Sequence, residues 1–109
     1  MQEIYPEWIR RKIEEYRNWM IGVRRQLHRY PETGDQEYKT TKYIQNLLKE
    51  MEFEIENPLP TGVIGILKPG GTGGKCVALR ADIDALPIQE ETALPFRSER
   101  DGYMHACGH

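Results

Sequence analysis

Several kinds of signal are scarce in this chain of 109 residues. Its 15 basic and 17 acidic residues leave a formal net charge of only -2, a field too weak to attract nucleic acid or an anionic membrane. No apolar run approaches the roughly 18 residues that a membrane-spanning helix needs, and no apolar segment typical of a secretory signal follows Met1. We therefore expect a cytoplasmic protein with neither nucleic-acid nor membrane partners.

Cysteine and histidine are also rare, with two cysteines and three histidines in the whole chain. Cys76 lies in an apolar run, whereas Cys107 stands in a short cluster between His105 and His109. A disulfide between the two cysteines is not expected, because cytoplasmic thiols are kept reduced. The cluster is therefore the first place to look for chemistry.

The first half of the chain has the periodicity of two helices. Apolar residues recur every three or four positions between residues 9 and 30, which predicts one helix with that face buried, and Pro6 suits its first turn. The stripe consists of Ile9, Ile13, Tyr16, Met20, Val23, Leu27 and Tyr30. The proline and glycine of residues 30–34 end this helix. A second amphipathic helix is predicted over residues 35–51.

Three short strands are predicted after the helices. Apolar and acidic residues alternate near residues 53–55, which indicates a half-exposed strand. Branched residues predict further strands at 63–67 and 75–83, and the glycine-rich connection 68–74 favours an antiparallel hairpin between them. The expected fold class is α/β, with two helices followed by a strand hairpin that belongs to a central mixed sheet.

The sharpest chemical feature is the segment 104–109, which reads Met-His-Ala-Cys-Gly-His. In an extended segment, residues two apart point to one side, so Cys107 and His109 can converge on one ion. Thiolate and imidazole suit zinc and several other divalent metals, although two ligands complete only part of a coordination sphere. Spacing alone supports a metal site and incidental loop residues about equally. The remaining histidine, His28, is interpreted as a helix-end residue that interacts with the last carbonyls and the dipole.

A second feature is the apolar segment 79–87, in which Asp82 and Asp84 follow a strand-like run. The two acids share one side of an extended chain, and a carboxylate buried there needs a partner or a metal. The alternative is a capped strand end whose acids face solvent.

Four segments, in order, resemble an amidohydrolase family that includes hippurate hydrolases, plant auxin-conjugate hydrolases and bacterial N-acyl-L-amino-acid deacylases. This family is related to aminoacylase and to the dinuclear-metal carboxypeptidases. The segments are 25–32 (RQLHRYPE), 61–65 (TGVIG), 77–90 (VALRADIDALPIQE) and 104–109 (MHACGH). The resemblance implies that residues 1–109 are the N-terminal part of a larger α/β catalytic domain and are incomplete alone.

Position by position, the resemblance implies that Cys107 and His109 are two ligands of a centre of two divalent ions, with zinc, manganese, cobalt and nickel all open. Asp84 takes the place of an acid that orients a metal-binding residue, whereas Asp82 replaces a histidine ligand and is not expected to bind. The general base and the other ligands lie downstream in the family. The implied reaction is hydrolysis of the amide bond of a small N-acyl amino acid, with this chain by itself inactive.

Two other classes of protein are left to weigh. A small, non-catalytic metal-binding module could use Cys107 and His109, together with His105, at a flexible terminus. A cysteine enzyme is disfavoured, because loop residues two apart rarely align an imidazole nitrogen with the sulfur and still leave room for substrate. The sequence names neither the acyl group, the amino acid nor the metal, and a homo-oligomer of the intact enzyme is compatible with the resemblance.

Overall fold

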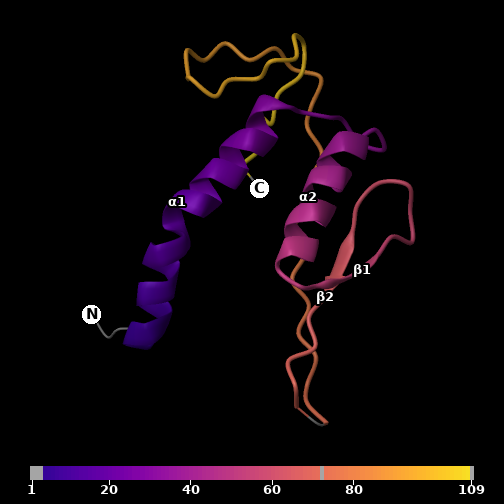
Figure 1. The fold of residues 1–109 in the computed structure, drawn as a ribbon. Coiled ribbons are helices and arrows are strands. Elements are labelled where there is room, and N and C mark those ends of the chain that lie inside the picture. The colour runs from indigo at the N-terminus through magenta and orange to yellow at the C-terminus, as the bar shows by residue number, and fades with distance from the viewer. Residues whose placement is uncertain (1–3, 72, 109) are drawn as a thin grey trace.

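The computed structural model describes residues 4–71 and 73–108. Its elements follow in the order α1 (Glu7–Arg29), α2 (Tyr38–Glu50), β1 (Glu54–Glu56) and β2 (Ile64–Ile66) (Figure 1). Both predicted helices are confirmed, and so is a hairpin of two antiparallel strands after them. The predicted fold class is therefore confirmed for this part of an α/β domain.

Helix α1 begins directly after Pro6, whose φ of -56° already suits the first turn. Its apolar stripe, however, is not buried as predicted. Ile13, Tyr16 and Met20 expose 50%, 51% and 44% of their surface, and His28 is the buried residue of the helix. The reason is that α1 stands apart from α2 and the hairpin along most of its length (Figure 1), so the described residues give the stripe no facing layer.

Helix α2 begins at Tyr38 rather than at Asp35, because Asp35 takes the left-handed conformation with a φ of 63°. The residue before the helix offers no side-chain cap. Instead, the Glu32 carboxylate accepts the N–H groups of Thr40 at 2.6 Å and Lys39 at 3.2 Å. A negative charge at this end also complements the helix dipole, so Glu32 caps α2 from outside the helix.

Strands β1 and β2 pair with Ile55 opposite Gly65, and the hairpin packs on α2. A Cβ atom at Gly65 would lie 3.1 Å from side-chain carbons of both Leu48 and Phe53. Glycine therefore allows a close approach of the strand to the helix, because a Cβ atom here would make tighter contacts than usual with both side chains.

The predicted pairing of residues 63–67 with 75–83 is wrong. Strand β2 pairs with β1, and residues 75–83 adopt no strand in the described structure. Val77 and Leu79 expose 83% and 98% of their surface. Branched and apolar residues stabilise a strand only where a ladder partner and a covering layer exist, and the described residues provide neither. Thr72, in the predicted connection, lies outside the described residues.

The described residues form little hydrophobic core of their own. Among the described residues, the buried apolar side chains are those of Ala85 and Pro31. The radius of gyration is 16.6 Å, against about 13 Å for a compact domain of this length. Polar residues make up most of the buried set: His28, Glu37, Thr40, Thr41 and Glu90. Neither described helix has the length and apolar character that crossing a bilayer requires.

A valine at Gly65 is expected to destabilise the natural protein that carries this chain by about 1–3 kcal/mol, because its side chain would overpack the contact with Leu48 and Phe53. Guanidinium unfolding followed by far-UV circular dichroism measures the change. Gly22→Ala is the matched control: no atom lies within 4 Å of a Cβ there, and alanine should stabilise α1 by up to about 1 kcal/mol. A Gly65→Val protein as stable as the wild type would contradict the described packing.

Candidate metal centre

The Asp-x-Asp segment is held by the turn that follows α1. The N–H of Ala85 donates to the carbonyl of Glu32 at 2.7 Å, and Thr33 and Ala85 form an isolated parallel bridge. Ala85 is only 2% exposed. Glu32 therefore acts twice, because its side chain caps α2 and its carbonyl holds the segment that contains Asp84.

The next residue, Leu86, holds the loop that contains Cys107. Its N–H donates to the carbonyl of Met104 at 2.9 Å, and the N–H of Met104 donates back to the carbonyl of Leu86 at 3.0 Å. The two residues form an isolated antiparallel bridge. The two segments that the sequence singled out for chemistry are thus neighbours in space.

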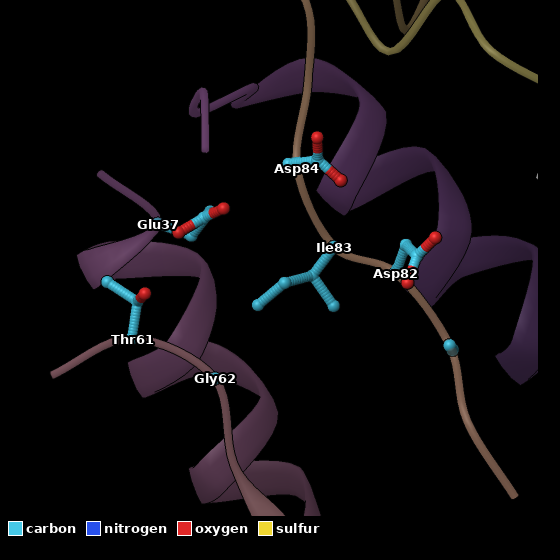
Figure 2. Close-up of a pocket in the computed structure, with 7 residues that line it drawn as sticks. Glu37, Thr61, Gly62, Asp82, Ile83 and Asp84 are labelled. Carbon is cyan, nitrogen blue, oxygen red and sulfur yellow. The ribbon is translucent and has the colours of Figure 1, made fainter. Parts of the chain in front are cut away.

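Asp82 and Asp84 border a cavity of about 220 Å³ (Figure 2). Figure 2 shows Ile83 pointing toward α2 and the two carboxylates on the other side of the segment, which is the predicted alternation. Both acids are exposed, and Arg80 contacts Asp82 at 3.2 Å. The cavity is lined by Glu37, Thr61, Gly62, Ala81, Asp82, Ile83 and Asp84. Both carboxylates are exposed, as the alternative interpretation expected, although the residues before them do not form a strand.

The turn on the opposite side of this cavity is fixed by side chains. Gly62, with a φ of 84°, donates its N–H to the hydroxyl of the buried Thr41 at 2.8 Å. Its carbonyl accepts the side-chain amide of Asn57, also at 2.8 Å. The Thr-Gly-Val segment noted in the sequence therefore forms one border of the cavity.

His105 stands two residues before Cys107, and its ring interacts with the backbone of Asp84. Its Nε2 atom is buried and has no hydrogen-bond partner among the described residues. Burial lowers the pKa of His105, and the neighbouring His28 lowers it further, whereas the charge and the backbone of Asp84 act to raise it. The net direction is downward from 6.5, so the ring is neutral at pH 7. The family resemblance had assigned this histidine no ligand role.

His28 lies in the last turn of α1, as the sequence suggested, but its ring bonds to a carboxylate rather than to the last carbonyls of the helix. Its Nε2 donates to the Oε1 atom of Glu90 at 2.8 Å, and the two side chains are only 9% and 2% exposed. The two residues lie 62 positions apart in the sequence. No spacing rule links positions so distant, so sequence reasoning missed Glu90 as a partner.

The Glu90 carboxylate accepts two more hydrogen bonds. The N–H of Ser98 donates to Oε1 at 2.9 Å, and the hydroxyl of Thr92 donates to the other oxygen. Burial alone raises the pKa of Glu90, but the bonds from Thr92, Ser98 and His28 outweigh burial and bring the pKa below its ordinary value of 4.5. Glu90 is therefore an ionised, buried and well-bonded carboxylate at neutral pH.

The described residues can supply part of a metal centre. Cys107 is exposed, and neither it nor Cys76 forms a disulfide. His109 lies outside the described residues. Across residues 4–71 and 73–108, no group of three His, Cys, Asp or Glu side chains is placed to hold an ion. A thiol with an imidazole two residues on suits a divalent transition metal, so this donor pair fits such an ion as part of its coordination sphere.

Comparison with known proteins agrees with this picture. The model of Peptidase family M20/M25/M40 matches residues 78–109, which include both chemical segments. The chain is 45% identical over 105 residues to thermostable carboxypeptidase 1 of Saccharolobus solfataricus, covering 94% of this chain and 26% of that protein. It is 50% identical over 91 residues to N-acetyl-L-cysteine deacetylase of Bacillus subtilis, covering 83% and 22%.

A solved structure shares the fold as well. The crystal structure of a Bacillus subtilis protein, described as a dinuclear metal binding peptidase from the M20 family, matches with a TM-score of 0.81 and 50% identity. The match covers 87% of this chain and 27% of that one. The chain thus spans about a quarter of the length of the relatives it matches.

Glu90→Gln is expected to destabilise the natural protein by about 1–3 kcal/mol at pH 7, because buried donors lose their charged acceptor. A carboxyl group whose pKa is lowered by folding stabilises the fold above its ordinary pKa of 4.5, and this contribution is lost as the pH falls through the folded value. The stability gap between wild type and variant should therefore narrow as the pH falls from about 6 to about 3.

Urea unfolding at a series of pH values measures this gap. The neighbouring exposed acid provides the control, since Glu91→Gln should change stability by no more than about 0.5 kcal/mol. A gap for Glu90→Gln that is the same at every pH would show that the ionised carboxylate does not stabilise the fold.

Proposed function

We propose that this chain forms part of a metal-dependent hydrolase of Peptidase family M20/M25/M40, whose model matches residues 78–109, and that the intact enzyme cleaves the amide bond of small N-acyl amino acids. The observation that supports this most directly is the bridge between Leu86 and Met104, which brings the Asp-x-Asp segment beside the loop of Cys107. An acidic segment next to a thiol and imidazole loop has the donor chemistry of a metal-dependent hydrolase.

Cys107 and His109 are the ligands proposed from this chain. Two divalent ions bound there would activate water for attack and polarise the amide carbonyl. Asp84 is proposed to orient a ligand without binding an ion, in keeping with its place beside His105. The general base and the remaining ligands are proposed to come from polypeptide beyond this chain, because the chain spans about a quarter of its relatives.

The proposed substrate class follows from chemistry that the relatives share. One relative is named a deacetylase of N-acetyl-L-cysteine and another a carboxypeptidase. Removal of an acetyl group from an amino acid and of an amino acid from a carboxyl end both break an amide bond at the nitrogen of an amino acid. An N-acyl amino acid is the smallest molecule that contains this bond, so it is the substrate to test first.

In the natural protein, Cys107→Ala and His109→Ala should each lower both metal content and the release of amino acid from N-acyl amino acids. The loss in rate should exceed about 100-fold, more than is typical for residues that only orient ligands. Elemental analysis and an amine-release assay measure the two effects. Cys76→Ala is the control, because its exposed thiol lies outside the candidate centre and its loss should change neither quantity. Wild-type metal content and rate in both ligand variants would refute the proposal.

The 109-residue chain alone is expected to release no amino acid from these substrates, whether zinc, manganese, cobalt or nickel is added. The reason is that its described residues bring no three ligands together. The natural protein assayed in parallel is the positive control. Metal binding without hydrolysis in both proteins would favour the non-catalytic module, whereas hydrolysis by the short chain would contradict the proposed division of the site.

A further inference from the structure

The ring of His28 contacts more than Glu90. Phe96 meets it edge-on, with ring centroids 5.7 Å apart and an interplanar angle of 78°. The ring of His105 lies 6.5 Å away at 38°. Arg25 covers the Phe96 ring at 4.6 Å. The buried side of α1 near its C-terminus therefore touches both the segment around Phe96 and the loop that contains Cys107.

The segment that follows Glu90 is fastened to the end of α1 by hydrogen bonds as well. The N–H of Glu99 donates to the carbonyl of Arg29 at 2.9 Å, and the guanidinium of Arg100 donates to the carbonyl of Pro31 at 3.3 Å. The first bond satisfies a carbonyl that the helix end leaves without an intrahelical partner, and the second holds the turn that follows the helix. The Glu90 carboxylate and the end of α1 thus belong to one hydrogen-bonded unit.

The loop that contains Cys107 depends on this unit through His105. Backbone hydrogen bonds between Met104 and Leu86 tie the loop to the end of the Asp-x-Asp segment. The residue after Met104 is His105, whose ring contacts His28 and the backbone of Asp84. Its ring is thus placed by side chains that are themselves held in position. Cys107 follows after a single intervening residue, so a displacement of this ring would also displace the backbone near the Cys107 thiol.

We propose that His28 and Glu90 are positioning residues for the metal-binding loop. Their buried contact fixes the ring of His105 and, through it, the direction in which Cys107 presents its sulfur. This inference rests on the proposed function, and neither His28 nor Glu90 touches metal or substrate in it. Residues that orient ligands in this way typically change metal affinity about 10–100-fold when they are replaced.

The test uses the natural protein, stripped of metal and titrated with cobalt(II), whose bond to a thiolate gives a charge-transfer absorption band. His28→Ala should weaken cobalt affinity about 10–100-fold and alter this band, because the ring of His105 loses its support. His28→Gln keeps an N–H donor for the Glu90 carboxylate, so most of the affinity and the wild-type band should return. Glu90→Gln should resemble His28→Ala, and the double variant should lose little more than either single variant.

A control variant distinguishes a role in positioning the loop from an effect on protein stability alone. Thr41→Val removes the hydroxyl that accepts the N–H of Gly62, in a residue as buried as His28 but bonded to a different turn. It should lower the melting temperature while leaving cobalt affinity and the thiolate band unchanged.

The remaining outcomes distinguish a positioning role from an effect on stability and from a failure of the proposed function. Wild-type cobalt affinity and band in His28→Ala, with a lowered melting temperature, would overturn the proposal, because the pair would then only stabilise the fold. Where His28→Ala does not fold, Glu90→Gln decides on the same two readings. A wild-type protein that neither binds cobalt through Cys107 nor hydrolyses an N-acyl amino acid would instead refute the proposed function, whatever His28 does.

Discussion

A carboxylate removed from water must find its hydrogen bonds inside the protein, and the rest of this structure depends on how Glu90 finds them. Its donors are the ring of His28, the hydroxyl of Thr92 and the N–H of Ser98. Because the first of these bonds spans 62 positions of sequence, it closes the chain on itself where few apolar side chains are available. Charge-assisted bonds of this kind are about twice as strong as neutral ones, which offsets the cost of burying the charge.

Glu32, in the turn after α1, likewise joins segments by accepting hydrogen bonds. Its carboxylate caps α2, its carbonyl accepts the N–H of Ala85, and the fully buried Pro31 precedes it. Hydrogen bonds to two acidic residues thus join segments that a hydrophobic core would hold together in a compact domain. The apolar surface that stays exposed, on α1 and on the segment with Val77 and Leu79, accords with a chain that spans about a quarter of its relatives.

What sequence reasoning predicted correctly is what neighbouring residues determine. The positions of α1 and α2, the presence of a hairpin and the alternation around Ile83 all follow from periodicity and turn residues. Three other predictions failed because they depend on segments remote in the chain. These were the burial of the apolar stripe of α1, the strand at residues 75–83 and the bonding partner of His28. The candidate ligands are a third case. The spacing of Cys107 and His109 supported a metal site and incidental loop residues about equally, and the resemblance of four ordered segments to a known family selected them as ligands.

The charged groups around His105 also come from segments that are remote in the chain. An imidazole with a buried, unpartnered Nε2 costs stability, and a leucine of similar size would avoid that cost. The ring is nevertheless suited to its place, because burial and the proximity of His28 lower its pKa and keep it neutral. A neutral ring adds no positive charge beside a loop proposed to receive a divalent cation, while Glu90 supplies negative charge on the far side of His28. In the proposed arrangement the polar cluster would therefore support the loop without repelling the ion that the loop is proposed to bind.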